Sequence, residues 1–128
     1  MSGSIKISEA EYEIMKVIWS SYPISTNEIV LKFKDKNEWS PRTIQTLISR
    51  LVKKGAISFT KRSREFVYTP LINENDYISE ESESFLNKFY NGTINSMVMN
   101  FIENDKLSHD DIEELKKILD NHDLNGGV

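Results

Sequence analysis

The chain has 128 residues, of which 38% are apolar and 28% charged, a composition typical of a folded globular protein rather than a disordered one. It contains no cysteine, which excludes disulfides, thiol catalysis and thiolate metal sites. No apolar run approaches the roughly 18 residues of a membrane span, and the N-terminal MSGSIKIS lacks the apolar stretch of a secretory signal, so we expect an intracellular, cytoplasmic protein.

The formal net charge of −4 conceals two halves of opposite sign. Residues 1–72 hold 12 Lys and Arg against 7 Asp and Glu, whereas residues 73–128 hold 4 against 13. A basic front half joined to an acidic back half suggests that the two halves have separate tasks, although such asymmetry also arises by chance. We predict two domains, residues 1–73 and residues 74–128.

Two short helices are predicted at the start of the chain. Ser8 and Glu11 form a capping-box pattern, after which the apolar residues of AEYEIMKVIW recur at helical spacing until Pro23 ends the helix. Ser25 and Glu28 repeat the capping pattern at the start of STNEIVLKFK. Both patterns indicate amphipathic helices that bury one face.

A third helix is predicted in SPRTIQTLISRLVKKG. Ser40 is placed to cap it, Pro41 occupies the first helical position, where a missing N–H costs nothing, and Gly55 supplies the stop. Five apolar residues at helical spacing form one continuous face for burial: Ile44, Leu47, Ile48, Leu51 and Val52.

The opposite face of this helix is polar and basic and contains no acidic residue, whereas a face that serves solubility alone usually mixes both signs. Arg pairs with guanine edges, Gln with adenine edges, and Thr with base edges or the thymine methyl group. In helix-turn-helix proteins the first turns of the recognition helix point at the bases. We therefore predict base contacts from four residues: Arg42, Thr43, Gln45 and Thr46.

Later positions in the same helix have different predicted tasks. Arg50 is placed to reach a base or a phosphate, and Lys53 and Lys54 are placed to contact phosphates. The alternative for the whole face is an ordinary solvated surface.

After Gly55 the pattern changes to that of a β-hairpin. AISFTKR and EFVYTP are rich in β-favouring residues, and the polar segment KRSRE lies between them. The basic tip, Lys61, Arg62 and Arg64, is placed to contact the DNA backbone or the adjacent minor groove, although charged turns are also common without a partner. Three helices followed by a hairpin is the order of the winged helix, a helix-turn-helix variant, so the predicted fold class is mainly α with a small β-hairpin.

Three further helices are predicted in the acidic half. Asp76 or Ser79 can open the first, Asn91-Gly92 ends it, TINSMVMNFIEN forms the second, and Ser108 caps the third. These helices carry more large apolar residues than so short a segment can bury: Phe85, Leu86, Phe89, Met97, Val98, Phe101, Ile102, Ile112, Leu115, Ile118 and Leu119. We predict a C-terminal three-helix dimerisation domain whose core a second copy completes. The alternative is that the helices fold back onto the N-terminal domain of the same chain.

The segments ISEAEYEIMKVIW, WSPRTIQTLISRLVKKG and FVYTP, in this order, resemble the BlaI/MecI family of winged-helix repressors, and the resemblance continues through FLNKFYNGTINSMVMNFIEND and DIEELKKIL. It implies a homodimer that binds a near-palindromic operator of a β-lactamase (penicillinase) gene and of its own regulatory operon. It also implies inactivation by cleavage of an Asn-Phe bond, triggered by a membrane-bound β-lactam sensor with a metalloprotease domain. The matching residues here are Asn100 and Phe101, which the helical pattern alone would describe as a surface polar residue and a core aromatic.

Other functions have weaker support in the sequence. The two histidines, His109 and His122, lie far apart and make a poor metal site without cysteine. No phosphate-binding glycine loop or Ser/His/Asp arrangement is evident, so we expect neither enzyme activity nor a cofactor. The basic helix lacks exposed aromatics for stacking on RNA bases. The remaining alternative is a winged-helix module that contacts proteins and does not recognise DNA sequence.

Overall fold

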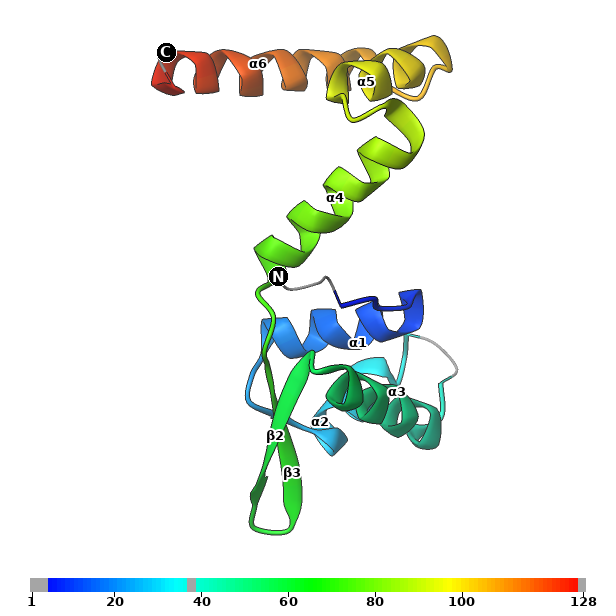
Figure 1. Ribbon diagram of the computed structural model, residues 1–128, viewed down its shortest axis with the longest axis vertical. Coiled ribbons are helices and arrows are strands. Elements are labelled where there is room, and N and C mark those ends of the chain that lie inside the picture. Colours follow the sequence, from blue (N-terminus) through cyan, green and yellow to red (C-terminus); the bar gives the residue numbers. More distant parts are fainter. Residues whose placement is uncertain (1–4, 37–38, 127–128) are drawn as a thin grey trace. The chain divides into compact units, whose positions relative to one another are not determined.

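The computed structural model describes residues 5–36 and 39–126, which form six helices and a three-stranded antiparallel sheet (Figure 1). They belong to two compact units, Met1–Glu80 and Glu81–Val128. The predicted fold class, mainly α with a small β-hairpin and a winged helix-turn-helix before a helical segment, is confirmed. Among the helices in the described ranges, none is long and apolar enough to cross a membrane.

The first two helices begin at the capping boxes that the sequence predicts. α1 spans Glu9–Ser20, and Ser8 Oγ accepts a hydrogen bond from the Glu11 N–H at 3.1 Å while the Glu11 carboxylate accepts from the Ser8 N–H at 2.9 Å. α2 spans Thr26–Phe33 and has the same reciprocal pair between Ser25 and Glu28, at 3.2 and 3.0 Å. Each box satisfies N–H groups that the helix itself leaves unpaired.

α3 spans Pro41–Lys54, and its two ends are formed as predicted. Ser40 Oγ accepts from the Thr43 N–H at 3.1 Å, and Pro41 occupies the first turn. At the other end Gly55 has φ +81°, in the left-handed region, and the next N–H, of Ala56, bonds the Leu51 carbonyl at 3.0 Å. A Cβ at Gly55 would meet no atom within 4 Å, so glycine is required there for its backbone conformation and not for space.

The core of the first unit forms where the inner faces of α1, α2 and α3 meet the start of the hairpin. α3 contributes four of its five predicted apolar residues as buried side chains, while Val52 is half-buried. The cluster consists of Ile14, Met15, Ile18, Ile24, Ile29, Phe33, Ile44, Leu47, Ile48, Leu51, Ala56, Ile57 and Tyr68.

The sheet contains the predicted hairpin and one strand that the sequence did not indicate. β2 (Ile57–Arg62) pairs with β3 (Glu65–Pro70), from Ile57 opposite Pro70 to Arg62 opposite Glu65. The additional strand, β1 (Ile24–Ser25), pairs with the other edge of β3 and gives the order β1-β3-β2. The hairpin projects beyond α2 and α3, with its turn at the far end (Figure 1).

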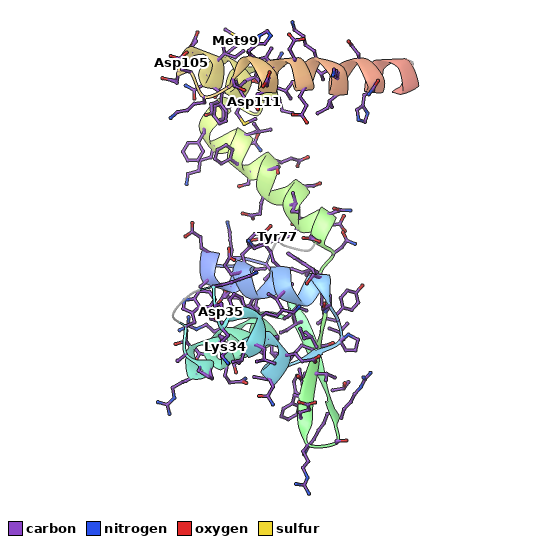
Figure 2. All side chains as sticks on the ribbon, turned by 180° about the vertical axis from the view of Figure 1, so that it is seen from behind. Lys34, Asp35, Tyr77, Met99, Asp105 and Asp111 are labelled. Carbon is purple, nitrogen blue, oxygen red and sulfur yellow. The ribbon has the colours of Figure 1, made fainter. Side chains whose placement is uncertain are left out.

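α4 spans Glu74–Tyr90 and begins earlier than the sequence suggested. The cap is Asn73, whose Oδ1 accepts from the Asp76 N–H at 3.0 Å, and not Asp76 or Ser79. The first turns of α4 pack on α1, because the Tyr77 ring lies 5.8 Å from that of Tyr12 and 5.9 Å from that of Trp19. Tyr77 is labelled in Figure 2.

The second unit contains the rest of α4, α5 (Ile94–Glu103) and α6 (His109–Gly126). α4 ends at Asn91 and Gly92, which have φ of +53° and +83°, as the sequence predicts. Ser108 Oγ accepts from the Asp111 N–H at 3.0 Å at the start of α6. Among the residues of this unit whose burial is described, 81–122, no side chain is fully buried, so the unit has no closed apolar core within one chain.

Candidate nucleic-acid interface

The outer face of α3 is a continuous polar and cationic surface. The four predicted base-contacting residues are all exposed, as are Ser49, Arg50 and Lys53. Most of these side chains line one shallow depression: Arg42, Gln45, Thr46, Ser49, Arg50 and Lys53.

In the part of the chain that the structure describes, no acidic side chain pairs with the basic residues of this face. The first turn of α3 contains no acidic residue. Within residues 5–36 and 39–126, none of Arg42, Arg50 and Lys53 forms an ion pair. The face therefore presents free guanidinium and ammonium groups, which suit phosphates and guanine edges.

Hydrogen bonds hold two of the predicted base-reading side chains. The Gln45 amide donates from Nε2 to Ser49 Oγ at 3.2 Å, and its Oε1 lies 3.4 Å from the hydroxyl of Thr26 on α2. Thr46 Oγ1 donates to the Arg42 carbonyl at 3.0 Å, which leaves its hydroxyl able to accept a further bond but not to donate one. α2 and α3 thus restrict the rotamers of the side chains that would face a ligand.

The basic tip of the hairpin forms a second cationic group in the same unit. Lys61, Arg62 and Arg64 are exposed, and none of them forms an ion pair with a residue that the structure describes. The turn is tight, with Ser63 in the left-handed region at φ +57°.

The strands of the hairpin also present an aromatic pair that the sequence analysis did not single out. The rings of Phe59 and Phe66 lie perpendicular with centroids 5.2 Å apart and are 50% and 44% exposed. The two positions are diagonal neighbours on one face of the β2–β3 ladder, which the alternation of each strand could have revealed.

Lys54 differs from the other predicted phosphate contacts. Its Nζ lies 2.5 Å from Glu11 Oε1 and 2.7 Å from the Lys6 carbonyl, so its charge is directed to the start of α1. Glu11 is only 2% exposed. Burial raises the pKa of this carboxyl, but the hydrogen bonds from Lys54 and Ser8 and the Lys54 charge outweigh it, and the pKa lies below its ordinary value of 4.5.

The second unit exposes many of the residues predicted to form a dimer. Six of the eleven are exposed, by between 38% and 63%: Phe85, Phe89, Ile102, Leu115, Ile118 and Leu119. The other five are half-buried: Leu86, Met97, Val98, Phe101 and Ile112. Ile94 and Met99, 59% and 54% exposed, extend the apolar surface beyond the predicted set.

The two residues that match the cleavage site lie within α5. Asn100 is exposed and its Oδ1 accepts from the Tyr90 hydroxyl at 3.1 Å, whereas Phe101 is half-buried. The Asn100 carbonyl accepts two hydrogen bonds from Asn104, one from its backbone N–H at 3.1 Å and one from Nδ2 at 2.8 Å. Among the residues that the structure describes, no three His, Asp or Glu side chains are grouped as a metal site.

Known proteins that are similar to this chain include penicillinase repressors and MecI regulators. The family model described as penicillinase repressor matches residues 7–121. The chain is 56% identical over 117 residues to the penicillinase repressor of Bacillus licheniformis, covering 91% of each protein. It is 46% identical over 114 residues to the methicillin resistance regulatory protein MecI of Mammaliicoccus sciuri, covering 89% of this chain and 93% of the relative.

Two solved structures are similar to part of the chain. The solution structure of the DNA-binding domain of the repressor BlaI has a TM-score of 0.54 and 51% identity, and the match covers 60% of this chain and 94% of that domain. The solution structure of monomeric B. licheniformis BlaI in complex with the blaP half-operator has a TM-score of 0.51 and 52% identity, over 58% of this chain and 92% of that one. The chain therefore belongs to the penicillinase repressor family, as its resemblance to the BlaI and MecI repressors predicted.

Proposed function

We propose that the chain represses transcription of a β-lactamase gene and its regulatory operon by binding operator DNA with α3 and the β2–β3 hairpin. The observation that carries this proposal is the cationic outer face of α3, whose basic residues Arg42, Arg50 and Lys53 pair with no described acidic residue. The inner face of the same helix is buried in the core. An α-helix fits the major groove of DNA, and a buried inner face keeps the reading side chains in a fixed frame. A relative 52% identical to this chain was solved with the blaP half-operator.

Residues 1–73 form the DNA-binding domain in this proposal. The first turns of α3 read bases through Arg42, Thr43, Gln45 and Thr46. Arg50 reaches a base or a phosphate, and Lys53 a phosphate. The hairpin tip, Lys61, Arg62 and Arg64, contacts the backbone or the adjacent minor groove.

Residues 74–128 form the dimerisation domain in this proposal. The support is physical: three amphipathic helices that leave residues such as Phe89 and Leu119 about 60% exposed in one chain need a partner surface. A symmetric dimer would place two copies of α3 on two half-sites of a near-palindromic operator. Two linked contacts bind far more tightly than either one alone.

In this proposal, cleavage of the dimerisation domain ends repression. A membrane-bound β-lactam sensor with a metalloprotease domain triggers cleavage between Asn100 and Phe101. Cleavage there would separate α6 from the rest of the chain and remove half of the apolar surface that forms the dimer. Each released monomer would hold one half-site only, and its affinity would fall accordingly.

A mobility-shift assay with a duplex that carries two copies of the blaP half-operator tests the DNA-binding function. We expect a retarded complex whose affinity falls about a thousandfold or more between about 50 and about 200 mM salt, as several phosphate contacts predict. Arg50→Ala should weaken binding at least about fivefold. Lys16→Ala is the matched control, because Lys16 is an exposed cation of α1 that pairs with Glu13.

The same assay separates this function from its alternative, a module that contacts proteins. The exposed pair Phe59 and Phe66 favours that alternative, because exposed aromatics are frequent at protein interfaces. Absence of a complex with any duplex at low salt would refute DNA binding and favour the protein-contact module.

A further inference from the structure

Two successive lysines at the end of α3 have different surroundings. Lys53 lies on the outer face and lines the depression with Arg42 and Arg50. Lys54, one residue and about 100° further around the helix, reaches α1 and bonds Glu11 and the Lys6 carbonyl. Their adjacent positions in the sequence suggest the same role for both residues, whereas their contacts in the structure indicate different roles.

Glu11, the partner of Lys54, is too deeply buried for water to replace the lysine ammonium group. Glu11 is 2% exposed, and its Oε1 accepts from both Lys54 Nζ and the Ser8 N–H. If Lys54 swung out to a DNA phosphate, this buried carboxylate would lose its counter-charge, and an unpaired buried charge is strongly destabilising. This cost favours retention of Lys54 on α1 over a contact with DNA.

The contact joins the last residue of α3 to the first turn of α1 and to the segment that precedes it. Ile5 and Ile7 of that segment pack against the core, so the attachment point is itself fixed. Near the other end of α3, the buried side chain of Ile44 holds the helix in the core. A helix fastened at both ends presents its outer face at one angle, and that angle decides which base edges its side chains meet.

We propose that Lys54 is a positioning residue for operator recognition, which anchors the C-terminal end of α3 to Glu11 and does not contact phosphate. The inference rests on the proposed function for its effect on DNA, while the anchor itself is a property of the fold. The two parts are therefore measured separately, on the full chain.

The stability of three variants tests the anchor. Lys54→Gln and Glu11→Gln should each lower the midpoint of thermal unfolding by roughly 4–10 °C, and the double variant by little more than the larger single change, because each removes the same ion pair. Lys53→Gln is the matched control and should change the midpoint by less than about 2 °C. Additive effects, or equal effects of Lys53→Gln and Lys54→Gln, would refute the anchor.

DNA binding well below the unfolding midpoint tests the positioning role. The two probes are the duplex with the blaP half-operators and a random duplex of equal length. Lys53→Gln should weaken binding to both duplexes and reduce the slope of log affinity against log salt by about 0.9 per bound protomer. Lys54→Gln should weaken binding to the operator duplex about threefold to tenfold, with the random duplex and the salt slope unchanged.

Two other results for Lys54→Gln would contradict the positioning role. A reduced salt slope in Lys54→Gln would make Lys54 a phosphate contact, and an unchanged ratio of operator to random affinity would leave it with a stabilising role only. Either result overturns the positioning role. If the wild-type chain binds neither duplex, the proposed function fails with it, while the unfolding midpoints still decide the anchor.

Discussion

The Glu11 side chain makes two structural interactions. It closes the capping box of α1 with Ser8, and it receives the charge of Lys54 from the end of α3. Both interactions favour the ionised carboxylate, which is why its pKa lies below 4.5 in spite of the burial that opposes it. Protonation of this one group should therefore weaken both the start of α1 and the attachment of α3.

The stability of the first unit should consequently depend on pH through Glu11. Because the folded-state pKa is lower than that of the unfolded chain, the ionised carboxylate stabilises the fold above about pH 4.5, and this contribution is lost as the pH falls through the folded value. We expect the difference in unfolding midpoint between wild type and Glu11→Gln to be at its full value from about pH 6 upward and to shrink below about pH 4.5. Thermal unfolding followed by circular dichroism measures it.

Glu13→Gln is the control for this pH series. Glu13 pairs with Lys16 on the surface of α1, where both side chains are about half exposed, so its removal should change stability little at any pH. A constant difference between wild type and Glu11→Gln across the whole range would show that the carboxylate charge of Glu11 contributes nothing.

The different surroundings of Lys53 and Lys54 were partly predictable from the sequence. Lys54 follows Leu51 by three residues and Leu47 by seven, so it lies beside the buried stripe, whereas Lys53 lies opposite it. The sequence analysis grouped the two by their distance along the helix and missed this difference. The acceptor could not be predicted, because Glu11 lies 43 residues away and only the packing of α1 on α3 brings it close.

The helices were predictable because their signals are local. Ser8 with Glu11, Ser25 with Glu28, Ser40 with Pro41 and the glycine at 55 all act within a few residues of the end that they define. β1 was missed for the opposite reason. It has only two residues, and it exists because Ile24 and Ser25 meet Tyr68 and Val67 of β3, far along the chain.

The start of α4 was predicted too late because Asn73 was not considered as a cap. Asn is as good a cap as Asp or Ser, and here its Oδ1 accepts from the N–H three residues on. The additional turn places Tyr77 against Tyr12 and Trp19, so the beginning of α4 belongs to the first unit.

α5 must open before a protease can cleave the proposed bond. Proteases bind extended chains, whereas the Asn100 carbonyl is held in helical geometry by the backbone N–H and the side chain of Asn104. We predict that Asn104→Ala increases the rate of cleavage after Asn100 about twofold to fivefold, since one exposed hydrogen bond that favours the closed helix is removed. Immunoblots of β-lactam-induced cells that contain the sensor-protease measure the rate.

Glu103→Ala provides the control at the same helix end. Glu103 is exposed and is the last residue of α5, so its removal should leave cleavage unchanged. Amide hydrogen exchange at position 104, expressed as a protection factor that corrects for the intrinsic rate of each residue, gives a second readout that does not need the protease, and the protection should be lower in Asn104→Ala than in wild type. Equal exchange and equal cleavage in both variants would mean that Asn104 does not restrict the opening of α5.

At the scale of the whole molecule, the two units differ in how they bury apolar surface. The first unit closes a core around fully buried side chains such as Ile14, Ile48 and Leu51. The second leaves large apolar side chains on all three helices in solvent, and it is also the acidic half of the chain. The acidic charge disfavours DNA as the partner of this surface, and a second copy of the same surface is the partner that we propose for it.

Leu119→Glu should therefore break the proposed dimer without unfolding the first unit. Leu119 is 63% exposed in one chain, so a charge there costs little in the monomer but is buried without a partner in a dimer. We expect the dimerisation constant to weaken at least about tenfold, and affinity for the duplex with two half-sites to fall while affinity for a single half-site is retained. Analytical ultracentrifugation and mobility shifts measure the two effects. Asn121→Glu adds the same charge to α6 at an exposed polar position, and an equal loss of dimer in both variants would exclude Leu119 from the interface.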